Sequence, residues 1–294
     1  MTNEYENPGL TAMVIVFEQD ARIDARPRDW DFGIYWAQSP LANVLPPDRF
    51  AQVPDAQVDD HVPEETDHIP IYNGATAARM STLPAPHTLR LGRRRFVEVI
   101  GKGVNIVYGK RISRIEAPTT PSTRVTAFFT DGTQHTADLL VGCEGAHSPT
   151  REFLLGAETA ALQPSPVVAS VVVTRLPTAC VETFLALVHW RSAITMHPEV
   201  HNSRDKQSLD EWDFMFILSW AQEAPVHLTG DEILDDIYRR GDGFAEPFRS
   251  LLHGIPAGTR AWHNRLSSWM PVPWDNRGGR VTLAGDAAHA MTFR

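Results

Sequence analysis

The feature that most constrains this chain is a short apolar strand that runs directly into a glycine and an aspartate, within Arg280–His289. The run Val281–Leu283 predicts a buried strand, and Gly285-Asp286 stands where a helix begins. Such a corner points backbone N–H groups and one carboxylate toward a sheet edge, where the phosphates and hydroxyls of a nucleotide bind. Gly285 and Asp286 are therefore candidate cofactor-binding residues, and an ordinary first-turn aspartate is the alternative.

A second strand-to-helix corner lies in the middle of the chain, between Asp138 and Arg151. Leu139–Gly142 predicts a strand, and Ser148 followed by Pro149 is typical of a helix N-terminus. Arg151 lies one turn further on, where a guanidinium can reach a phosphate or an acidic partner. The alternative is a capped turn that binds no ligand. The candidate residues of this corner are Glu144, Gly145, Ser148 and Arg151.

Charged side chains provide two further candidates for cofactor binding. Glu18 follows the apolar run Ala12–Phe17, which predicts a strand buried on both faces of a parallel sheet. A carboxylate at that position can bind the ribose hydroxyls of an adenosine, and a surface acid is the alternative. In the basic stretch Arg90–Arg95, one arginine could face a pyrophosphate while the others stay solvated.

The rest of the pattern predicts a mixture of helices and strands. Residues 24–90 have weak periodicity and are expected to form long loops, apart from a short helix near Gln38–Leu45. Helices are expected at Arg90–Ile100 and Asp231–Arg240, and a hairpin turn at Asp131-Gly132. The later strands suggest a second, antiparallel sheet. The predicted strands are Val104–Tyr108, Arg111–Glu116, Arg124–Phe129, Val167–Val173 and Asp213–Leu218.

The composition of the chain limits the kinds of partner that it is expected to bind. The 294 residues are 43% apolar, which is enough for a sizeable core, and the net charge of -9 gives no reason to expect nucleic acid or an anionic membrane. Cys143 and Cys180 have neither disulfide-framework nor zinc-site spacing, so no metal is expected and a reducing cytoplasm fits. No apolar run approaches the length of a membrane span.

Together, these elements resemble the class A flavoprotein monooxygenases, the FAD-dependent aromatic hydroxylases built like p-hydroxybenzoate hydroxylase. Leu139–Arg151 is similar to that family's Asp-Gly motif near the FAD, and Val281–His289 is similar to its Gly-Asp motif, whose aspartate contacts the ribityl chain. Arg26–Trp36 is similar to a segment of fungal members that act in secondary metabolism. The resemblance extends from about Gly9 to Arg294.

The resemblance implies an α/β fold in which an incomplete, Rossmann-like FAD-binding domain carries an inserted, mainly antiparallel β-sheet substrate domain. The expected boundaries are 1–165 for the first part of the FAD-binding domain, 166–275 for the substrate domain and 276–294 for the closing strand and helix start. The resemblance also adds Arg28 and Arg93 (or Arg94) to the cofactor-binding candidates, and Glu18 falls where the family has its ribose-binding acid.

The implied activity is insertion of one oxygen atom from O2 into an aromatic or polyketide- or terpenoid-like small molecule, with FAD as cofactor and NADPH or NADH as reductant. No catalytic residue is assigned, because the cofactor carries the chemistry. Candidates for a base are His189, His197 and His201. The residues expected to line a substrate pocket, which serve equally well as core, are Phe184, Trp190, Phe214 and Phe216.

The chain also departs from the family pattern. The family opens with a Gly-x-Gly-x-x-Gly turn, of which Pro8–Thr11 resembles the end, and Glu144 replaces an aspartate. The chain is therefore expected to be truncated at both ends, and a catalytically inactive homologue that no longer holds FAD is the alternative. A flavin-dependent halogenase or reductase ranks lower because no Trp-x-Trp-x-Ile signature is found, and a nicotinamide dehydrogenase gives Gly285-Asp286 no role.

Overall fold

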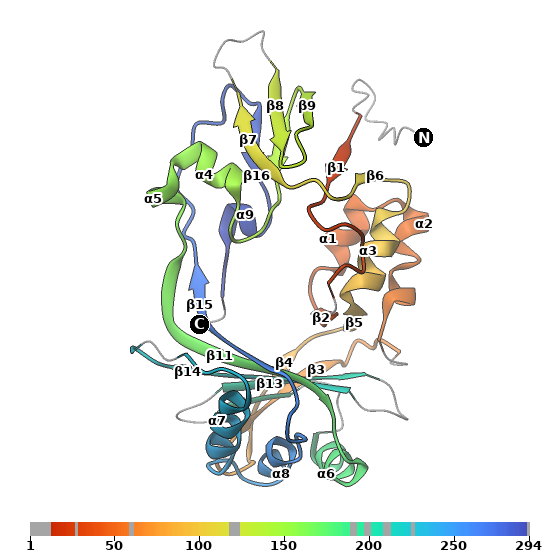
Figure 1. Cartoon of the computed structure of the whole chain (residues 1–294). Helices are drawn as coiled ribbons and strands as arrows, with labels where there is room; N and C mark the ends of the chain where they lie inside the picture. The colour runs from red at the N-terminus through yellow and green to blue at the C-terminus, as the bar shows by residue number, and fades with distance from the viewer. Residues whose placement is uncertain are drawn as a thin grey trace. The chain divides into compact units, whose positions relative to one another are not determined.

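The computed structural model (Figure 1) divides the chain into two compact units. Unit 1 comprises Met1–Arg28, Gly101–Ser165 and Leu266–Arg294, and unit 2 comprises Asp29–Ile100 and Pro166–Arg265. The structure describes residues 13–26, 29–58, 62–117, 124–188, 193–196, 201–207, 213–224 and 227–292.

Unit 1 contains two pairs of parallel strands. Strand β1 (Ile15–Phe17) pairs with β6 (Asn105–Val107), and β10 (Leu140–Gly142) pairs with β16 (Val281–Leu283). Burial of β1 on both faces was expected, but Val16 is 40% exposed. The reason is that β1 pairs with β6 alone among the described strands, so one edge and part of one face stay open.

An antiparallel three-stranded sheet completes the strands of unit 1. It consists of β7 (Ile112–Glu116), β8 (Val125–Phe129) and β9 (Gln134–Ala137). The predicted turn at Asp131-Gly132 is confirmed, and Gly132 has a φ of 84°, which favours glycine. The rings of Phe17 and Phe129 lie 4.7 Å apart, so β1 packs against this sheet.

Three short helices follow strands of unit 1: α4 (Pro149–Leu155), α5 (Ala157–Ala160) and α9 (Asp286–His289). The predicted cap of α4 is confirmed, because the Ser148 hydroxyl accepts the Arg151 N–H and Pro149 opens the helix. The helices and strands share one apolar core. Its buried members are Ile115, Val125, Leu154, Val281, Leu283 and Ala287.

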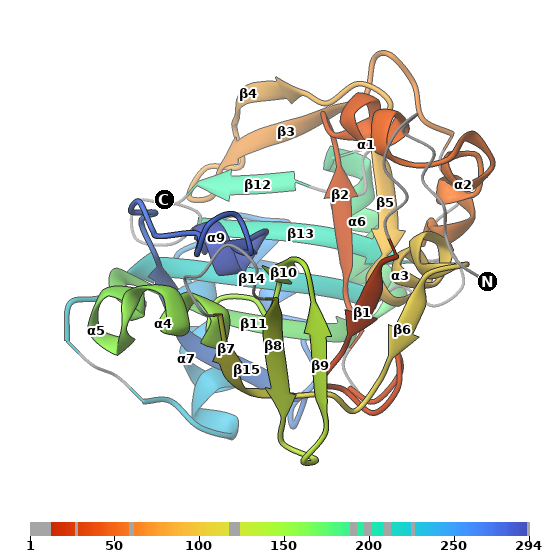
Figure 2. The same cartoon turned by 90° about the horizontal axis from the view of Figure 1, so that it is seen from above.

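Unit 2 is built on one seven-stranded sheet, seen face-on in Figure 2. Strand β3 pairs with β12 in parallel, whereas β11 with β14, β14 with β13, β13 with β12 and β3 with β4 are antiparallel, so the predicted antiparallel sheet contains a parallel pair. In spatial order its strands are β15 (Ala261–Ser268), β11 (Gln163–Arg175), β14 (Asp213–Ala221), β13 (His201–Gln207), β12 (Ala193–Met196), β3 (His68–Asn73) and β4 (Arg79–Pro84).

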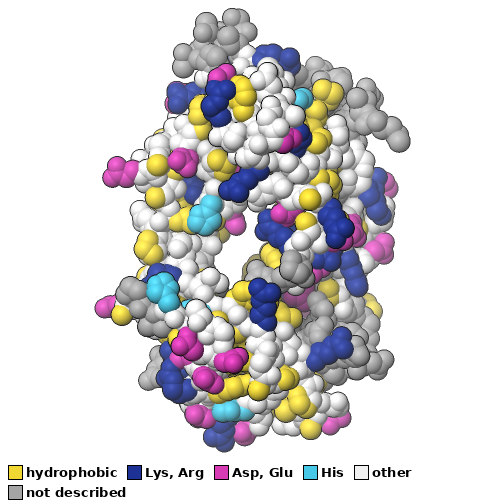
Figure 3. All heavy atoms as spheres, in the orientation of Figure 1, with side chains coloured by type: hydrophobic (Ala, Val, Ile, Leu, Met, Phe, Trp, Pro, Cys, Tyr) yellow, Lys and Arg dark blue, Asp and Glu magenta, His cyan; other side chains and the backbone are white. Residues whose placement is uncertain are grey.

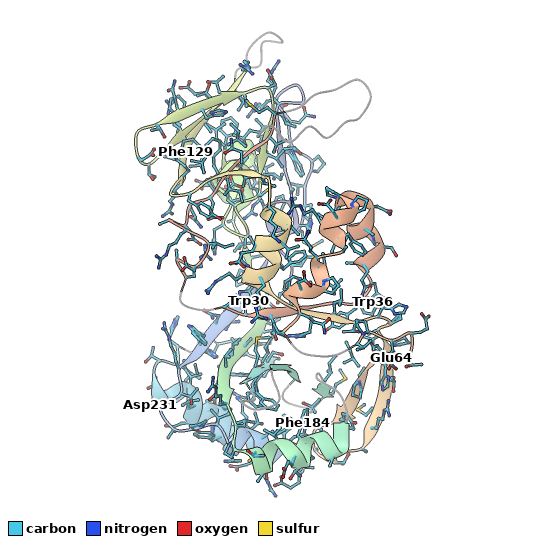
Figure 4. All side chains as sticks on the ribbon, turned by 90° about the vertical axis from the view of Figure 1, so that its right-hand side faces the viewer. Trp30, Trp36, Glu64, Phe129, Phe184 and Asp231 are labelled. Carbon is cyan, nitrogen blue, oxygen red and sulfur yellow. The ribbon has the colours of Figure 1, made fainter. Side chains whose placement is uncertain are left out.

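Helices α6 (Thr178–Val188), α7 (Asp231–Gly241) and α8 (Phe248–His253) cover one face of this sheet (Figure 1). Phe184 of α6 (Figure 4) packs edge-on against Phe214 of β14, and both belong to the core beneath the helices together with Phe216. Of the two roles expected for these three aromatic residues, pocket lining and core, the structure shows the core: each is 2% exposed or less.

The expectation of long loops over residues 24–90 is wrong. These residues form several short elements, whose apolar side chains build a separate small core around Leu89 and Leu91. Proline begins α2 and lies within η1, which explains why no long periodicity marks them. Besides β3 and β4, the elements here are β2 (Asp31–Ile34), α1 (Gln38–Val44), α2 (Pro47–Phe50), η1 (Val53–Ala56), β5 (Leu89–Gly92) and the following helix α3 (Arg93–Gly101).

The two units also divide the chain differently from the expected boundaries. Residues 29–100 were expected within the FAD-binding part, but they belong to unit 2. The cause is the pairing of β3 with β12 and of β3 with β4, which places this segment in the large sheet. The mixed α/β class itself is confirmed, and no helix in the described ranges is long and apolar enough to span a membrane.

Candidate functional site

The two predicted corners lie side by side in unit 1. Leu140, Val141 and Gly142 pair in parallel register with Val281, Thr282 and Leu283, and the Ala284 N–H donates to the Gly142 carbonyl at 2.9 Å. Because parallel strands end at the same edge of a sheet, the chain leaves both strands at the same edge. We call Cys143–Ser148 the first corner and Ala284–Asp286 the second corner.

Gly142 lets helix α4 approach strand β10 closely. A Cβ atom on Gly142 would lie 2.6 Å from Cβ of Thr150 and 2.9 Å from Oε2 of Glu144. Real side chains do not come so close, so any larger residue would push the helix away from the strand. This close packing sets where the first corner begins.

The first corner is closed by its own acid. Glu144 accepts a hydrogen bond from the Ser148 hydroxyl at 2.7 Å and another from the Thr150 hydroxyl. Ser148 is 3% exposed and Thr150 is fully buried, whereas Glu144 lies on the surface. Gly145 has a φ of 85°, a conformation that favours glycine. The carboxylate therefore fixes the start of α4 while one side of the corner stays open to solvent.

Arg151 is the link between the corners. Its Nη2 donates to the Ala146 carbonyl in the first corner, and its Nη1 donates to the carbonyls of Asp286 at 3.4 Å and Ala287 at 3.1 Å. Its Nε donates to the Ala160 carbonyl at 3.0 Å. The residue is 2% exposed, and burial lowers the pKa of its guanidinium while Glu144 opposes that shift. Direct contact of Arg151 with a cofactor stays a prediction, and these contacts favour a positioning role.

The second corner has open space beside its glycine and an exposed carboxylate. Gly285 has φ 59° and ψ -144°, and a Cβ atom placed on it would meet nothing within 4 Å. Its carbonyl accepts the N–H groups of Ala288 at 2.9 Å and His289 at 3.0 Å, which starts α9. The Asp286 side chain is exposed. This arrangement can accept hydrogen bonds from hydroxyl groups of a ligand lying over the glycine.

Glu18 lies where the sequence predicted, directly after β1. Its N–H donates to the Val107 carbonyl at 3.0 Å, and its carbonyl accepts from Lys110 at 2.8 Å. Its Oε1 accepts the Asp20 N–H at 2.9 Å. The half-buried carboxylate is thereby held at the carboxyl end of a parallel strand, the position at which a ribose-binding acid is expected.

Of the two other arginine candidates, the structure describes one. Arg93 is exposed on unit 2, where it opens α3; its N–H donates to the Trp30 carbonyl at 3.0 Å, and its guanidinium carbon is 5.8 Å from the Trp30 ring (Figure 4). Arg28 lies outside the described residues, so both assignments stay predictions.

The three histidines that are candidate bases have no described side chains. His189 and His197 lie outside the described residues, as do Trp190 and the side chain of His201. Within the described ranges, no group of three His, Cys, Asp or Glu residues could hold a metal ion. On the face drawn in Figure 3, basic and acidic side chains are interspersed.

Two residues of the site escaped the sequence analysis. Thr150 binds Glu144, and its spacing from Ser148 could have suggested that the hydroxyls act as a pair. Trp269 packs on Arg151, and no local pattern could have indicated this because the two residues lie far apart in the sequence.

A family model and similar curated proteins agree on the kind of protein that this chain resembles. Residues 101–293 match the model of the FAD binding domain family. The chain is 48% identical to the FAD-dependent monooxygenase cctM of Talaromyces islandicus, over 95% of this chain and 71% of that protein. It is 33% identical to the FAD-dependent monooxygenase dbaB of Emericella nidulans, over 94% and 74%.

Solved structures show the same fold. Klebsiella pneumoniae HpxO complexed with FAD and uric acid matches with a TM-score of 0.70 and 16% identity, over 94% of this chain and 72% of that chain. The 2,6-dihydroxypyridine-3-hydroxylase of Arthrobacter nicotinovorans matches with a TM-score of 0.66 and 16% identity, over 93% and 70%. These likenesses concern the fold.

Proposed function

Because this chain belongs to the family of FAD-dependent monooxygenases, we propose that it holds FAD at the two corners of unit 1 and inserts one oxygen atom from O2 into an aromatic or other electron-rich small molecule. NADPH or NADH would serve as reductant. The observation that supports this most directly is the side-by-side placement of the first and second corners, tied together by Arg151.

The residues of the second corner fit the hydroxylated part of FAD. The space beside Gly285 is open, and the Asp286 carboxylate is exposed and able to accept hydrogen bonds from ribityl hydroxyls. Glu18 would accept hydrogen bonds from the adenosine ribose, because the Asp20 N–H fixes its Oε1 and the half-buried carboxylate stands at the end of β1. Gly145 leaves the first corner open toward the same edge.

When bound, FAD supplies the redox chemistry of the reaction. The task of this chain is then to bind and orient the cofactor. Asp286 and Glu18 would accept hydroxyl hydrogens, and Glu144 would keep the start of α4 in place through Ser148 and Thr150. Arg151 would act through the backbone, by holding the carbonyls of both corners.

The substrate class is inferred from unit 2. Strand β14 directs Phe214, Phe216 and Leu218 into the helix-covered core, so Met215 and Ile217 belong to the opposite face of the sheet. Both are half-buried and uncharged. Val173 and Val171 of β11 pair with these two residues and share the face. This part of the face suits an apolar molecule, such as the aromatic or polyketide- or terpenoid-like substrate that the resemblance implies.

The test is whether the purified chain takes up flavin. The protein is incubated with FAD, free cofactor is removed, and the visible flavin absorbance is measured per chain. We expect bound FAD, and bleaching on addition of NADPH or NADH would identify the reductant. A protein that stays colourless after reconstitution would favour the alternative, an inactive homologue that no longer holds FAD.

The residue assignment is tested by Asp286→Asn. Loss of a charge-assisted acceptor should weaken FAD binding about tenfold or more. The matched control is Asp275→Asn, another exposed aspartate of unit 1, whose carboxylate binds Arg277. Fluorescence titration with FAD measures both, and equal affinity in the two variants would remove Asp286 from the site.

A further inference from the structure

Trp269 is a buried aromatic residue to which no role has been assigned. It follows β15 directly, belongs to unit 1 and is 3% exposed. Its indole N–H donates to the Thr159 carbonyl at 2.8 Å, and its backbone N–H donates to the Ala290 carbonyl at 2.8 Å. It therefore joins the end of α5 to the residue that follows α9.

The ring of Trp269 covers the guanidinium of Arg151. The guanidinium carbon lies 4.8 Å from the ring centroid. The guanidinium donates its hydrogen bonds to backbone carbonyls, among them those of Asp286 and Ala287. A buried cation bound to neutral carbonyls is stabilised by an aromatic face above it, and a desolvated stack of this kind is a strong one.

We propose that Trp269 is a positioning residue of the cofactor site: the face of its ring holds Arg151 against the carbonyls of both corners. The cofactor part of this proposal rests on the proposed function. The part that concerns the corners themselves does not, because it describes the protein before any ligand binds.

If Trp269 only filled space, its replacement by another large apolar residue would leave the two corners unchanged. Leucine or methionine in place of Trp269 would still occupy apolar volume, but neither has an aromatic face for the guanidinium nor an N–H group for Thr159. Phenylalanine keeps the face and loses the N–H group. The series Trp269→Phe, Trp269→Leu and Trp269→Met therefore separates the stack from the volume.

The first measurement is hydrogen exchange in the protein without flavin. The backbone N–H groups of Arg151 and His289 report on the two corners, because they donate to the Ser148 hydroxyl and to the Gly285 carbonyl respectively. Trp269→Leu should speed their exchange about tenfold relative to the amides of β8, and Trp269→Phe should change it much less. If leucine prevents folding, methionine takes its place.

The control is Val125→Ala, which opens the core of unit 1 at β8 without touching Arg151 or Trp269. It should lower the unfolding midpoint but leave both reporters unchanged relative to other core amides. Uniformly faster exchange in Trp269→Leu, as in the control, would overturn the proposal. Equal effects of phenylalanine and leucine would overturn it too, since the aromatic face would then be irrelevant.

The second measurement is FAD affinity below all unfolding midpoints. Trp269→Leu should raise the FAD dissociation constant about tenfold, whereas Trp269→Phe and Val125→Ala should stay near the parent value. Altered exchange with no FAD binding in the parent chain would refute the proposed function and leave the link between Trp269 and the corners standing. Unchanged affinity in Trp269→Leu would refute the cofactor part.

Discussion

At the scale of single residues, His263 of β15 shows how surroundings set a protonation state. Its Nδ1 and the hydroxyl of the buried Ser170 lie 3.0 Å apart, and its ring is 5.5 Å from that of Trp220. Its Nε2 is buried without a hydrogen-bond partner in the described part of the chain. A protonated imidazole would place a second donor on this unpaired nitrogen, so the neutral ring is favoured.

The charges around His263 act in both directions. Burial lowers the pKa of the imidazole and is the largest cause; Asp236 opposes it, while Arg240, His227 and Arg265 lower the pKa further. The folded pKa is therefore below the ordinary value that the unfolded chain retains.

A dependence of stability on pH follows from that difference. The unfolded chain binds more protons once the pH falls below about 6.5, so the free energy of unfolding should decrease as the pH drops from there toward the folded pKa. Urea unfolding at a series of pH values measures this slope. In His263→Gln the contribution should vanish; a slope identical to that of the parent would show that other groups cause it.

Single residues also show what the sequence can and cannot predict. The cap Ser148-Pro149 was predicted because it depends on neighbours in the chain. Arg151 was expected to reach a phosphate or an acidic partner, and the sequence did not indicate its hydrogen bonds to the carbonyls of Asp286 and Ala287, far away in the sequence. Local spacing carries no information about such partners, so the corner was predictable and its internal link was not.

At the scale of elements, the packing of α4 on β10 depends on a missing side chain. Gly142→Ala would place a Cβ atom 2.6 Å from Thr150, on the side of a helix that cannot yield without shifting the first corner. We expect a loss of about 1–3 kcal/mol in the free energy of unfolding. Chemical denaturation with circular dichroism would measure it.

A second glycine provides the comparison for this substitution. A Cβ atom on Gly101, at the end of α3, meets the flexible tip of Ile106 at 3.3 Å, so Gly101→Ala should be close to neutral or slightly stabilising. Similar losses for both variants would show that glycine's general properties, and not the approach of Thr150, explain the effect.

Elements were predicted well where apolar runs were continuous, as in β10, β14 and β16, and where a turn signal was strong, as at Asp131-Gly132. Between residues 24 and 90 the helix at Gln38–Val44 was predicted. The other elements there were missed, because strands and helices of about one turn carry too few residues to establish a period. The parallel pairing of β3 with β12 was also beyond reach, since pairing partners depend on the assembled sheet.

At the scale of the whole molecule, FAD should stabilise the chain by mass action. A ligand present at 100 times its dissociation constant adds about 2.7 kcal/mol to the folded state that binds it. If the units unfold in separate transitions, we expect FAD to shift the transition that contains unit 1. Differential scanning calorimetry at increasing FAD concentration measures the shift, and no shift at saturating FAD would contradict binding at unit 1.

The same calorimetric titration of the Asp286→Asn variant tests whether the stabilisation by FAD depends on the second corner. It should need a higher FAD concentration for the same shift, because the variant lacks the proposed hydroxyl acceptor. Riboflavin, which shares the ribityl chain but lacks the adenosine, should stabilise less than FAD if Glu18 also contributes. Identical curves for the parent and the variant would place the flavin elsewhere.

For the whole molecule, the sequence predicted the family, the mixed α/β class and the FAD-binding domain. It could do so because two such corners, in this order and at this separation, are together specific for that family. The division into units was not predictable. Residues 29–100 join unit 2 through β3 and β4, and nothing in their composition marks them as part of a sheet whose other strands come much later in the chain.

The pairing of β10 with β16 has a consequence for biosynthesis. Between Gly142 and Val281 the ribosome must make most of unit 2, so a nascent chain carries β10 without its neighbour for the whole of that interval. Closing so long a loop is slow, and an unpaired strand is prone to associate with other chains meanwhile. Production of this protein should therefore benefit from chaperones and slow translation, and the edge proposed to bind the cofactor should be among the last parts of the molecule to mature.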